Sequence, residues 1–430
     1  MTTMRVSLVV LVLSLGQAGA SVAQTVDDLF NPAGLHDVRL VLHSSDWQNL
    51  KNNFLDNTYY PTDLTWGGVT VRNVGIRSRG LGSRSPVKPG LRVDFDRYAS
   101  GQRFLGVKSI VLDNLTQDPS MMREVLSMSL FIRLGLPAPR EAFVRLYVNN
   151  TLVGLYAVVE SIDKQFLERV FNQNNGNLFE YDYTIDYNFE YLGPDLAPYE
   201  ALFSPKTNET HSRFELYDPI ERMVRAVNQT ADAAFEGVMT QFLDLATFMK
   251  HVAVETFVAE NDGLLGYAGM NNFYFYQFQD RPQFQVITWD KDNAFIQADF
   301  PLFLRADRNV LMRRALTIPA ARQAYLDGVI AAADSAAEGQ VGVDGGTGWL
   351  ALEIERLYTL IRSASQQDQS KPYSDADFED AVAGLRVFAR VRGGFVRCEV
   401  ANLSRVPQAC AASGSSAAAA GALRIRTDAR

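Results

Sequence analysis

Two pairs of oxygen-bearing side chains stand on either side of an aromatic segment. Asn271 and Asn272 precede the segment 273–289, and Asp290 and Asp292 follow it. Within the segment, two runs rich in aromatic and β-branched residues flank a short polar turn, which predicts a β-hairpin. The ends of an antiparallel hairpin lie side by side, so we expect these side chains to share one edge. Carboxylate and amide oxygens suit Mg²⁺ or Mn²⁺, and the spacing predicts a metal site that could carry a polyphosphate.

A further carboxylate, Asp262, lies in a separate loop after a helical run that ends near Glu260. Taken alone, an Asp-x-Asp sequence after a strand is often only a solvated turn. Here Trp289 makes the residues before the Asp-x-Asp turn apolar, and Asp262 supplies a second acidic loop. The hairpin also brings the amide pair beside the Asp-x-Asp turn. The metal site is therefore the favoured interpretation, with a solvated turn as its alternative.

A basic, glycine-rich loop runs from Gly75 to Ser85 and is followed by Lys88 and an alternating strand. Glycine backbone N–H groups and guanidinium groups can bind phosphate, although a flexible surface turn is the alternative. A helix is predicted over Ser120–Leu134, with Glu124 set off from its apolar stripe. Glu124 could pair with a lysine on the preceding sheet.

Composition limits the class of protein. The chain has 430 residues, of which 47% are hydrophobic and 21% charged, so it can bury a large core in one two-lobed domain or two domains. The net charge of −8 argues against general binding to nucleic acid. Predicted strands dominate the first part of the chain, and predicted helices dominate the part after the hairpin.

The N-terminus has the pattern of a secretory signal. Arg5 is followed by an apolar run and by small residues, with cleavage equally plausible after Ala20 or Ala23. No later segment is long and apolar enough to span a bilayer. In an exported chain, Cys398 and Cys410 are expected to form a disulfide, the alternative being two unrelated buried thiols.

The segments described above, together with others, resemble the CotH kinase family, which comprises spore-coat-protein-H-type secreted kinases. The resemblance covers roughly Val38 to Phe295 and rests on the number and order of its motifs. These motifs are Arg77-Ser78-Arg79-Gly80, Lys88-Pro89, Asp118-Pro119-Ser120-Met121-Met122-Arg123-Glu124, Gly135-Leu136-Pro137-Ala138-Pro139-Arg140, Gly154-Leu155-Tyr156, Val159-Glu160, Gly176-Asn177-Leu178, Asn271-Asn272-Phe273-Tyr274 and Trp289-Asp290-Lys291-Asp292.

The resemblance implies an α+β, atypical protein-kinase-like fold with a small β-rich N-lobe and a larger helical C-lobe. We expect a signal peptide over residues 1–23 and a kinase-like domain over 24–410. Its N-lobe would span about 36–181 and its C-lobe about 218–410. The alanine-rich residues 411–430 are expected to form a disordered tail.

The resemblance also implies transfer of the γ-phosphate of ATP to serine or threonine of an exported protein, with Mg²⁺ as cofactor and Mn²⁺ as its alternative. Asp262 would take the acceptor hydroxyl's proton, and Lys88 would contact the α- and β-phosphates while pairing with Glu124. The metal would be held by Asn272 and by Asp290 or Asp292. The implied nucleotide-binding residues are Arg77, Arg79, Gly80, Gly82, Ser83, Lys88 and Glu160.

Some roles and functions stay open. No His-Arg-Asp triplet precedes Asp262, so base and metal ligand could be exchanged among the three aspartates. Lys108, at another strand edge, is the alternative to Lys88. A non-catalytic surface or adhesion protein is the first rival function, although clustered carboxylates argue against it. A glycosyltransferase using Asp-x-Asp is the second, although alternating strand–helix units are missing before the motif.

Overall fold

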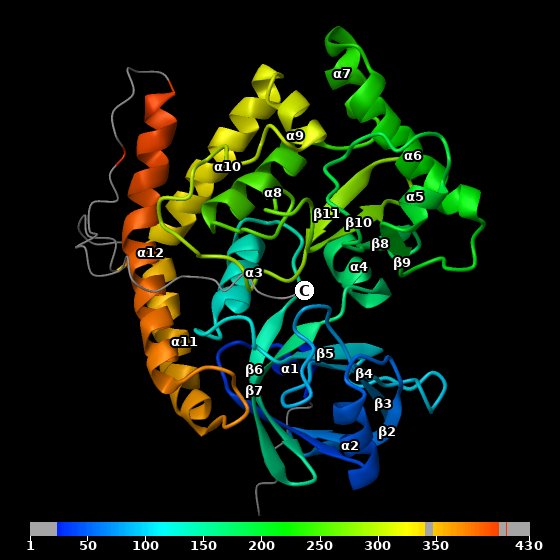
Figure 1. Cartoon of the computed structure of the whole chain (residues 1–430), viewed down its shortest axis with the longest axis vertical. Coiled ribbons are helices and arrows are strands. Elements are labelled where there is room, and N and C mark those ends of the chain that lie inside the picture. The colour runs from blue at the N-terminus through cyan, green and yellow to red at the C-terminus, as the bar shows by residue number, and fades with distance from the viewer. Residues whose placement is uncertain (1–23, 340–346, 404–409, 411–430) are drawn as a thin grey trace, which may run out of the picture.

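Residues 36–160 contain the seven strands of a closed β-barrel, with strand order β1-β2-β3-β4-β5-β7-β6. The computed structural model describes residues 24–339, 347–403 and 410, and Figure 1 shows the barrel at one end of the molecule. Closure comes from parallel pairing of β1 with β6, while the other neighbours pair antiparallel. The strands are β1 His36–Val41, β2 Tyr60–Trp66, β3 Val69–Ser78, β4 Leu91–Asp94, β5 Ser109–Asp113, β6 Glu141–Val148 and β7 Thr151–Glu160.

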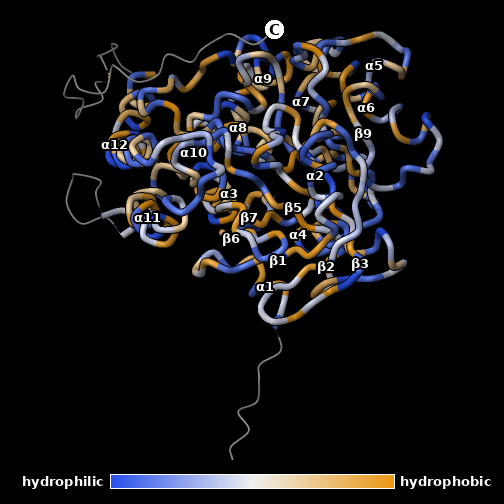
Figure 2. Tube along the Cα trace, turned by 60° about the horizontal axis from the view of Figure 1, so that its bottom comes forward, coloured by the Kyte–Doolittle hydropathy of each residue, from blue (hydrophilic) through white to orange (hydrophobic). Residues whose placement is uncertain are grey.

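Alternating side chains fill the barrel. Leu40, Ile76, Val93 and Ile110, from four different strands, are all fully buried in one apolar cluster. The tight connection between β6 and β7 uses Asn149 and Asn150, both with positive φ, as a two-residue hairpin turn requires. Figure 2 shows apolar stretches concentrated along β5, β6 and β7. These strands have buried residues on both faces, because their outer faces pack against the rest of the molecule.

A second sheet has the strand order β11-β10-β8-β9. Its strands are β8 Asn177–Tyr181, β9 Phe203–Pro205, β10 Phe273–Gln277 and β11 Phe284–Thr288. The predicted hairpin is confirmed, with Phe273 opposite Thr288. The N-lobe predicted from the sequence spans about residues 36–181 and so includes β8. In the structure, β8 pairs with β10 and not with a strand of the barrel. The barrel sheet therefore ends at Glu160, because the strand that follows finds its partner in the hairpin.

Helices lie around the second sheet, along one side of the molecule and, in the case of α1 and α2, against the barrel (Figure 1). They are α1 Val26–Leu29, α2 Ser44–Asn52, α3 Arg123–Arg133, α4 Lys164–Phe171, α5 Ala197–Glu200, α6 Arg213–Gln229, α7 Asp232–Met239, α8 Leu245–Phe257, α9 Val310–Ala315, α10 Pro319–Ala337, α11 Trp349–Gln367 and α12 Asp375–Asn402. α3 begins later than the predicted Ser120. The carboxylate of Asp118 accepts the backbone N–H groups of Ser120, Met122 and Arg123, which forms a turn before the helix proper.

The architecture is thus mixed α+β, with a barrel and a helix-surrounded sheet, in agreement with the predicted fold class at that level. Cys398 and Cys410 form the predicted disulfide. Within the described part of the chain, no helix combines the length and apolar character needed to cross a bilayer. The predicted signal peptide and the predicted C-terminal tail lie outside the described residues.

Candidate active site

The base of the β10–β11 hairpin brings the two motifs of the sequence together. Asn272 immediately precedes β10 and Asp290 follows β11 by two residues, and both have left-handed backbone conformations, with φ of 58° and 48°. Asparagine and aspartate tolerate this conformation better than most residues, although it still stores strain. Lys291, between the two aspartates, points into the protein, where its Nζ donates to the carbonyl of Asn272 at 2.9 Å. This bond links the exit of the hairpin directly to its entry.

Asp262 lies beside this hairpin base. Its Oδ2 accepts hydrogen bonds from the side-chain amides of Asn271, at 3.1 Å, and of Asn272, at 3.2 Å. Its backbone N–H donates to Glu260 Oε1 at 2.6 Å, which orders the loop after α8. Burial raises the pKa of Asp262, while the amide of Asn271 acts in the opposite direction. Two amides therefore hold the carboxylate in a defined orientation.

Several further carboxylates approach the exit of the hairpin. Burial, followed by the charge of Asp113, raises the pKa of Asp290 to about 6, although Arg79 opposes this shift. Burial and the charge of Asp290 raise the pKa of Asp292 well above its usual value. The pKa of Glu124 on α3 is also raised well above normal, by burial and then by the charge of Glu141. Each of these groups disfavours ionisation of its neighbours, as expected for carboxylates that lie close together.

Glu141, at the start of β6, adds to this acidic cluster, which we define as Asp113, Glu124, Glu141, Asp290 and Asp292. Both of its carboxylate oxygens are buried and accept no hydrogen bond of normal geometry from the described residues. Burial and the charge of Asp113 raise its pKa well above the usual value. The Glu124 carboxyl lies close enough to oppose this shift, so Glu124 and Glu141 form a pair of neighbouring buried carboxyl groups within the cluster.

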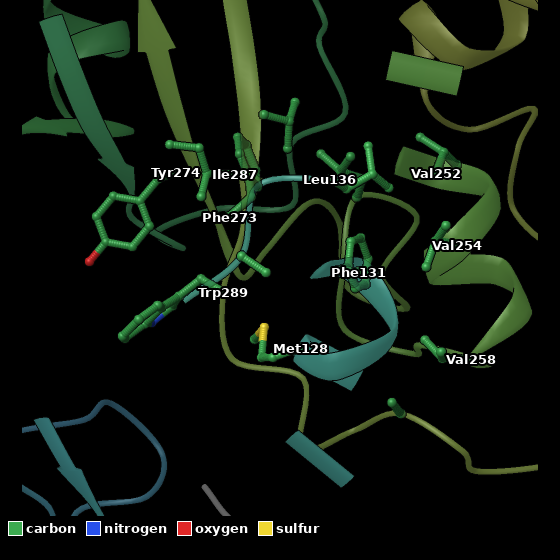
Figure 3. Close-up of a cluster of buried hydrophobic side chains, with 14 of the residues drawn as sticks. Met128, Phe131, Leu136, Val252, Val254, Val258, Phe273, Tyr274, Ile287 and Trp289 are labelled. Atoms are coloured by element: carbon green, nitrogen blue, oxygen red, sulfur yellow. The ribbon is translucent and has the colours of Figure 1, made fainter. Parts of the chain in front are cut away.

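Arg79 provides positive charge at the acidic cluster. Its guanidinium lies 3.9 Å from Asp113 and over the ring of Trp289, with the Arg79 Cζ 5.3 Å from the ring centroid. Trp289 in turn packs edge-on against Tyr274, at 5.5 Å between ring centroids. Figure 3 shows these two rings at the margin of a buried cluster whose other members include Met128 and Phe131 of α3. Arg79 therefore lies between the barrel and the second sheet, where the acidic motif is.

The other residues predicted to bind phosphate occupy different positions. Gly80 has a φ of 110°, and a Cβ there would lie 2.4 Å from Ser83 Oγ, so this turn requires glycine. Gly82 is less constrained, because a Cβ there would meet only Gln117 at 3.9 Å. Arg77 donates to the side-chain oxygen of Asn57 at 2.9 Å, on the side of the loop near α2. The loop itself is observed, whereas its binding of phosphate stays a prediction.

One predicted contact needs correction, and a second predicted site residue has a side chain engaged elsewhere. Lys88 does not pair with Glu124, because its Nζ lies 2.7 Å from Asp368, in the connection between α11 and α12, and neither side chain is exposed. The carboxylate of Glu160 is engaged by two arginines, Arg140 at 2.9 Å and Arg169 at 2.6 Å, so its side chain holds the chain together at the end of β7. The partners of both ion pairs depend on packing between elements that are distant in the sequence, so the sequence pattern did not specify them.

Lys108, the alternative to Lys88, lies near the surface and pairs with Asp96 at 3.4 Å. His251 is fully buried in α8, with its Nε2 3.5 Å from Glu255. The sequence pattern did not predict that Asp113, Glu141 and Lys291 belong to the candidate site. The position of Lys291 could have indicated its role. If Asp290 and Asp292 face the same side of the chain, the lysine between them must face the opposite side.

A divalent cation fits the donor set at the hairpin base, which is made of hard oxygens. Within residues 24–339, 347–403 and 410, no group of three or more His, Cys, Asp or Glu side chains is arranged to hold a metal ion alone. Mg²⁺ in nucleotide sites usually takes one or two protein carboxylates and completes its shell with water and phosphate. Asn272, Asp290 and Asp292 meet that requirement in number and kind.

Comparison with known proteins agrees with the resemblance seen in the motifs. The chain is similar to the inner spore coat protein H of Bacillus subtilis (strain 168), with 26% identity over 267 residues, covering 61% of this chain and 69% of that protein. It is also similar to the invasin CotH3 of Rhizopus delemar, with 23% identity over 263 residues, or 56% of this chain and 40% of the invasin. The alignment thus spans less than half of the invasin. A family model described as CotH kinase protein matches residues 76–396, and the chain therefore belongs to the CotH kinase family.

Proposed function

We propose that this chain is a divalent-metal-dependent protein kinase that transfers the γ-phosphoryl group of ATP to serine or threonine of exported proteins. The observation that carries the proposal is the geometry of the hairpin base, where Asp262 accepts the side-chain amides of Asn271 and Asn272 and Lys291 links the exit of the hairpin to its entry. Burial and neighbouring carboxylates also raise the pKa of Asp290 and Asp292, so nearby positive charge would favour their ionised forms. A metal–nucleotide complex supplies that charge in a phosphoryl-transfer site. Membership of the CotH kinase family supports the same assignment.

In this proposal each residue of the site has a separate role in phosphoryl transfer. Asn272 and one or both of Asp290 and Asp292 hold the metal, whose chemistry when bound is to neutralise charge on the phosphates. Arg79 binds a phosphate oxygen. Asp262, oriented by its two amide contacts, receives the proton of the acceptor hydroxyl. The hydroxyl oxygen forms the new bond to the γ-phosphorus, the bond to the β,γ-bridging oxygen breaks, and ADP leaves with that electron pair.

The architecture supplies the remaining elements of the proposal. The barrel would act as the small lobe and the helix-surrounded sheet as the large lobe, with the nucleotide between them near Arg79 and Trp289. Export is supported by the sequence pattern of a signal peptide, by the disulfide and by similarity to an invasin. Adenine binding near Val159 and Glu160 is part of the same proposal, without the Glu160 carboxylate, which Arg140 and Arg169 engage.

The test is binding of ATP by titration calorimetry with Mg²⁺, with Mn²⁺ and with EDTA. Metal-dependent ATP binding, followed by transfer of label from γ-labelled ATP to casein or to the chain itself, is the expected result. Equal ATP affinity with and without metal would contradict the metal role. Labelled sugar nucleotides in a parallel assay address the glycosyltransferase alternative.

A second candidate is a non-catalytic surface protein, and the similarity to a protein named as an invasin, from Rhizopus delemar, favours it. In that case the carboxylates would serve only to bind a cation. Metal binding without ATP binding would support this candidate over the kinase.

A further inference from the structure

A fully buried ion pair joins the glycine-rich loop to the C-terminal helices. Lys88 Nζ lies 2.7 Å from Asp368 Oδ2, and both side chains have 0% of their surface exposed. The ammonium also lies 5.1 Å from the ring centroid of Tyr156 on β7. In this position Lys88 has no surface with which to contact a nucleotide.

Asp368 is itself held by the barrel. Its Oδ2 accepts the backbone N–H of Leu155 at 3.0 Å, and its Oδ1 accepts the N–H of Ser370 at 2.9 Å. Gly154 has a φ of 155°, and a Cβ there would lie 2.5 Å from the Asp368 carboxylate. A register shift between β6 and β7 occurs at this point. The missing side chain of Gly154 therefore leaves room in the barrel wall for the Asp368 carboxylate. Figure 1 shows that α11 and α12 reach this end of the molecule.

Backbone contacts connect Lys88 to Arg79. The carbonyl of Lys88 accepts the side-chain amide of Asn114 at 2.8 Å, and the carbonyl of Pro89 accepts the Tyr156 hydroxyl at 3.1 Å. The carbonyl of Gly90 then accepts the backbone N–H of Arg79 at 2.9 Å. Fixing Lys88 thus fixes one end of the 80–90 loop, and Arg79 stands at the other end.

We infer that Asp368 is a positioning residue, which anchors the loop through Lys88 so that Arg79 supplies the cation for the phosphates. The phosphate part rests on the proposed kinase function, whereas the anchoring does not. A buried lysine that loses its partner is left with an uncompensated charge, so removing either member of the pair should release the loop. The α11–α12 connection is thereby part of the nucleotide site without contacting the nucleotide.

The experiment compares Lys88→Met and Asp368→Asn with Ile361→Ala. Ile361 is fully buried in α11, so its truncation lowers stability while the ion pair stays intact. Each pair variant should raise the KM for ATP by about tenfold or more, the effect of losing one well-placed charged phosphate contact, while kcat changes less. Trypsin should also cleave after Arg84 faster than in the wild type at temperatures where the protein remains folded. Ile361→Ala should change neither quantity.

Wild-type KM and unchanged cleavage after Arg84 in both pair variants would overturn the inference. An equal rise in KM in Ile361→Ala would overturn it too, because the pair would then act only through overall stability. If the wild type binds no ATP, the kinase proposal fails, and the rate of cleavage after Arg84 still decides whether the ion pair anchors the loop. Comparable cleavage rates in all variants would refute the anchor by itself.

Discussion

Lys291 Nζ lies 2.9 Å from Glu255 Oε1, and this ion pair fixes the hairpin base to α8. Burial opposes ionisation of Glu255, yet the charge of Lys291 and the contact with His251 lower its pKa to about 2. The second Glu255 oxygen accepts the backbone N–H of Leu264 at 2.9 Å, in the loop that follows Asp262. One buried pair therefore positions both acidic loops of the candidate active site.

Lys291→Met should destabilise the protein by about 3–5 kcal/mol, because Glu255 would be left buried with its charge unpaired. Urea unfolding measures this free energy. Arg386→Gln, which removes an ion pair between α12 and Glu355 near the surface, is the control and should cost at most about 1 kcal/mol. A loss in Lys291→Met no larger than that of the control would contradict the anchoring role.

The Glu255 pair also predicts a pH dependence. Its pKa is lower in the folded state, about 2, than the ordinary value of 4.5, so its contribution is complete above pH 4.5. This contribution should be lost progressively as the pH falls from 4.5 towards 2. Thermal unfolding over that range should show a steeper decline in the wild type than in Glu255→Gln. Parallel curves would exclude the ion pair as the cause.

Asp262→Asn should leave metal-dependent ATP affinity nearly unchanged while turnover falls by about 10²–10⁴-fold, the usual value of general-base assistance. Asparagine can still accept the hydrogen bonds of Asn271 and Asn272, so the loop should keep its conformation. Calorimetry and steady-state kinetics on the same preparations measure the two effects. Loss of ATP binding in Asp262→Asn, with normal binding in Asp290→Asn and Asp292→Asn, would show that base and metal ligand are exchanged.

Asp290→Asn should weaken metal-dependent ATP binding and, without metal, stabilise the folded protein above pH 6. The folded-state pKa of Asp290, about 6, lies above the ordinary 3.8, so ionisation costs stability as the pH rises from about 4 to 6. The gain is at most about 3 kcal/mol. Asparagine also tolerates the left-handed backbone at this position. Thermal unfolding at pH 4 and pH 8 with EDTA measures the effect, and equal shifts at both values would argue against it.

Arg392→Met should lower stability by several kcal/mol without changing ATP affinity. The buried guanidinium donates to four backbone carbonyls, those of Thr256 at 2.7 Å, Phe257 at 2.9 Å, Ala298 at 3.1 Å and Phe300 at 2.6 Å. Each carbonyl left without a donor costs roughly 1–3 kcal/mol unless water replaces it. Chemical unfolding and calorimetry separate the two effects. A changed ATP affinity at unchanged stability would mean that α12 acts on the site directly.

The sequence by itself determined the hairpin, the family and the grouping of Asp262, Asn272, Asp290 and Asp292. These features follow from local patterns, since a period-two apolar run forms a strand and a short turn brings its two ends together. β10 pairs with β11 as expected, and Lys291 at the exit of this hairpin donates to the carbonyl of Asn272 at its entry, with no distant element required.

Only the tertiary structure decided which ion pairs form. Lys88 meets Asp368 and not Glu124, and Glu160 meets Arg140 and Arg169, because packing of α11–α12 and α4 against the barrel selects these partners. A local sequence pattern shows that a charged side chain is present. It does not show which oppositely charged residue, far along the chain, will become its partner. The acidic cluster likewise joins Asp113, Glu141 and Asp290 from three separate strands or strand ends, a juxtaposition that exists only once the barrel and the second sheet are packed together.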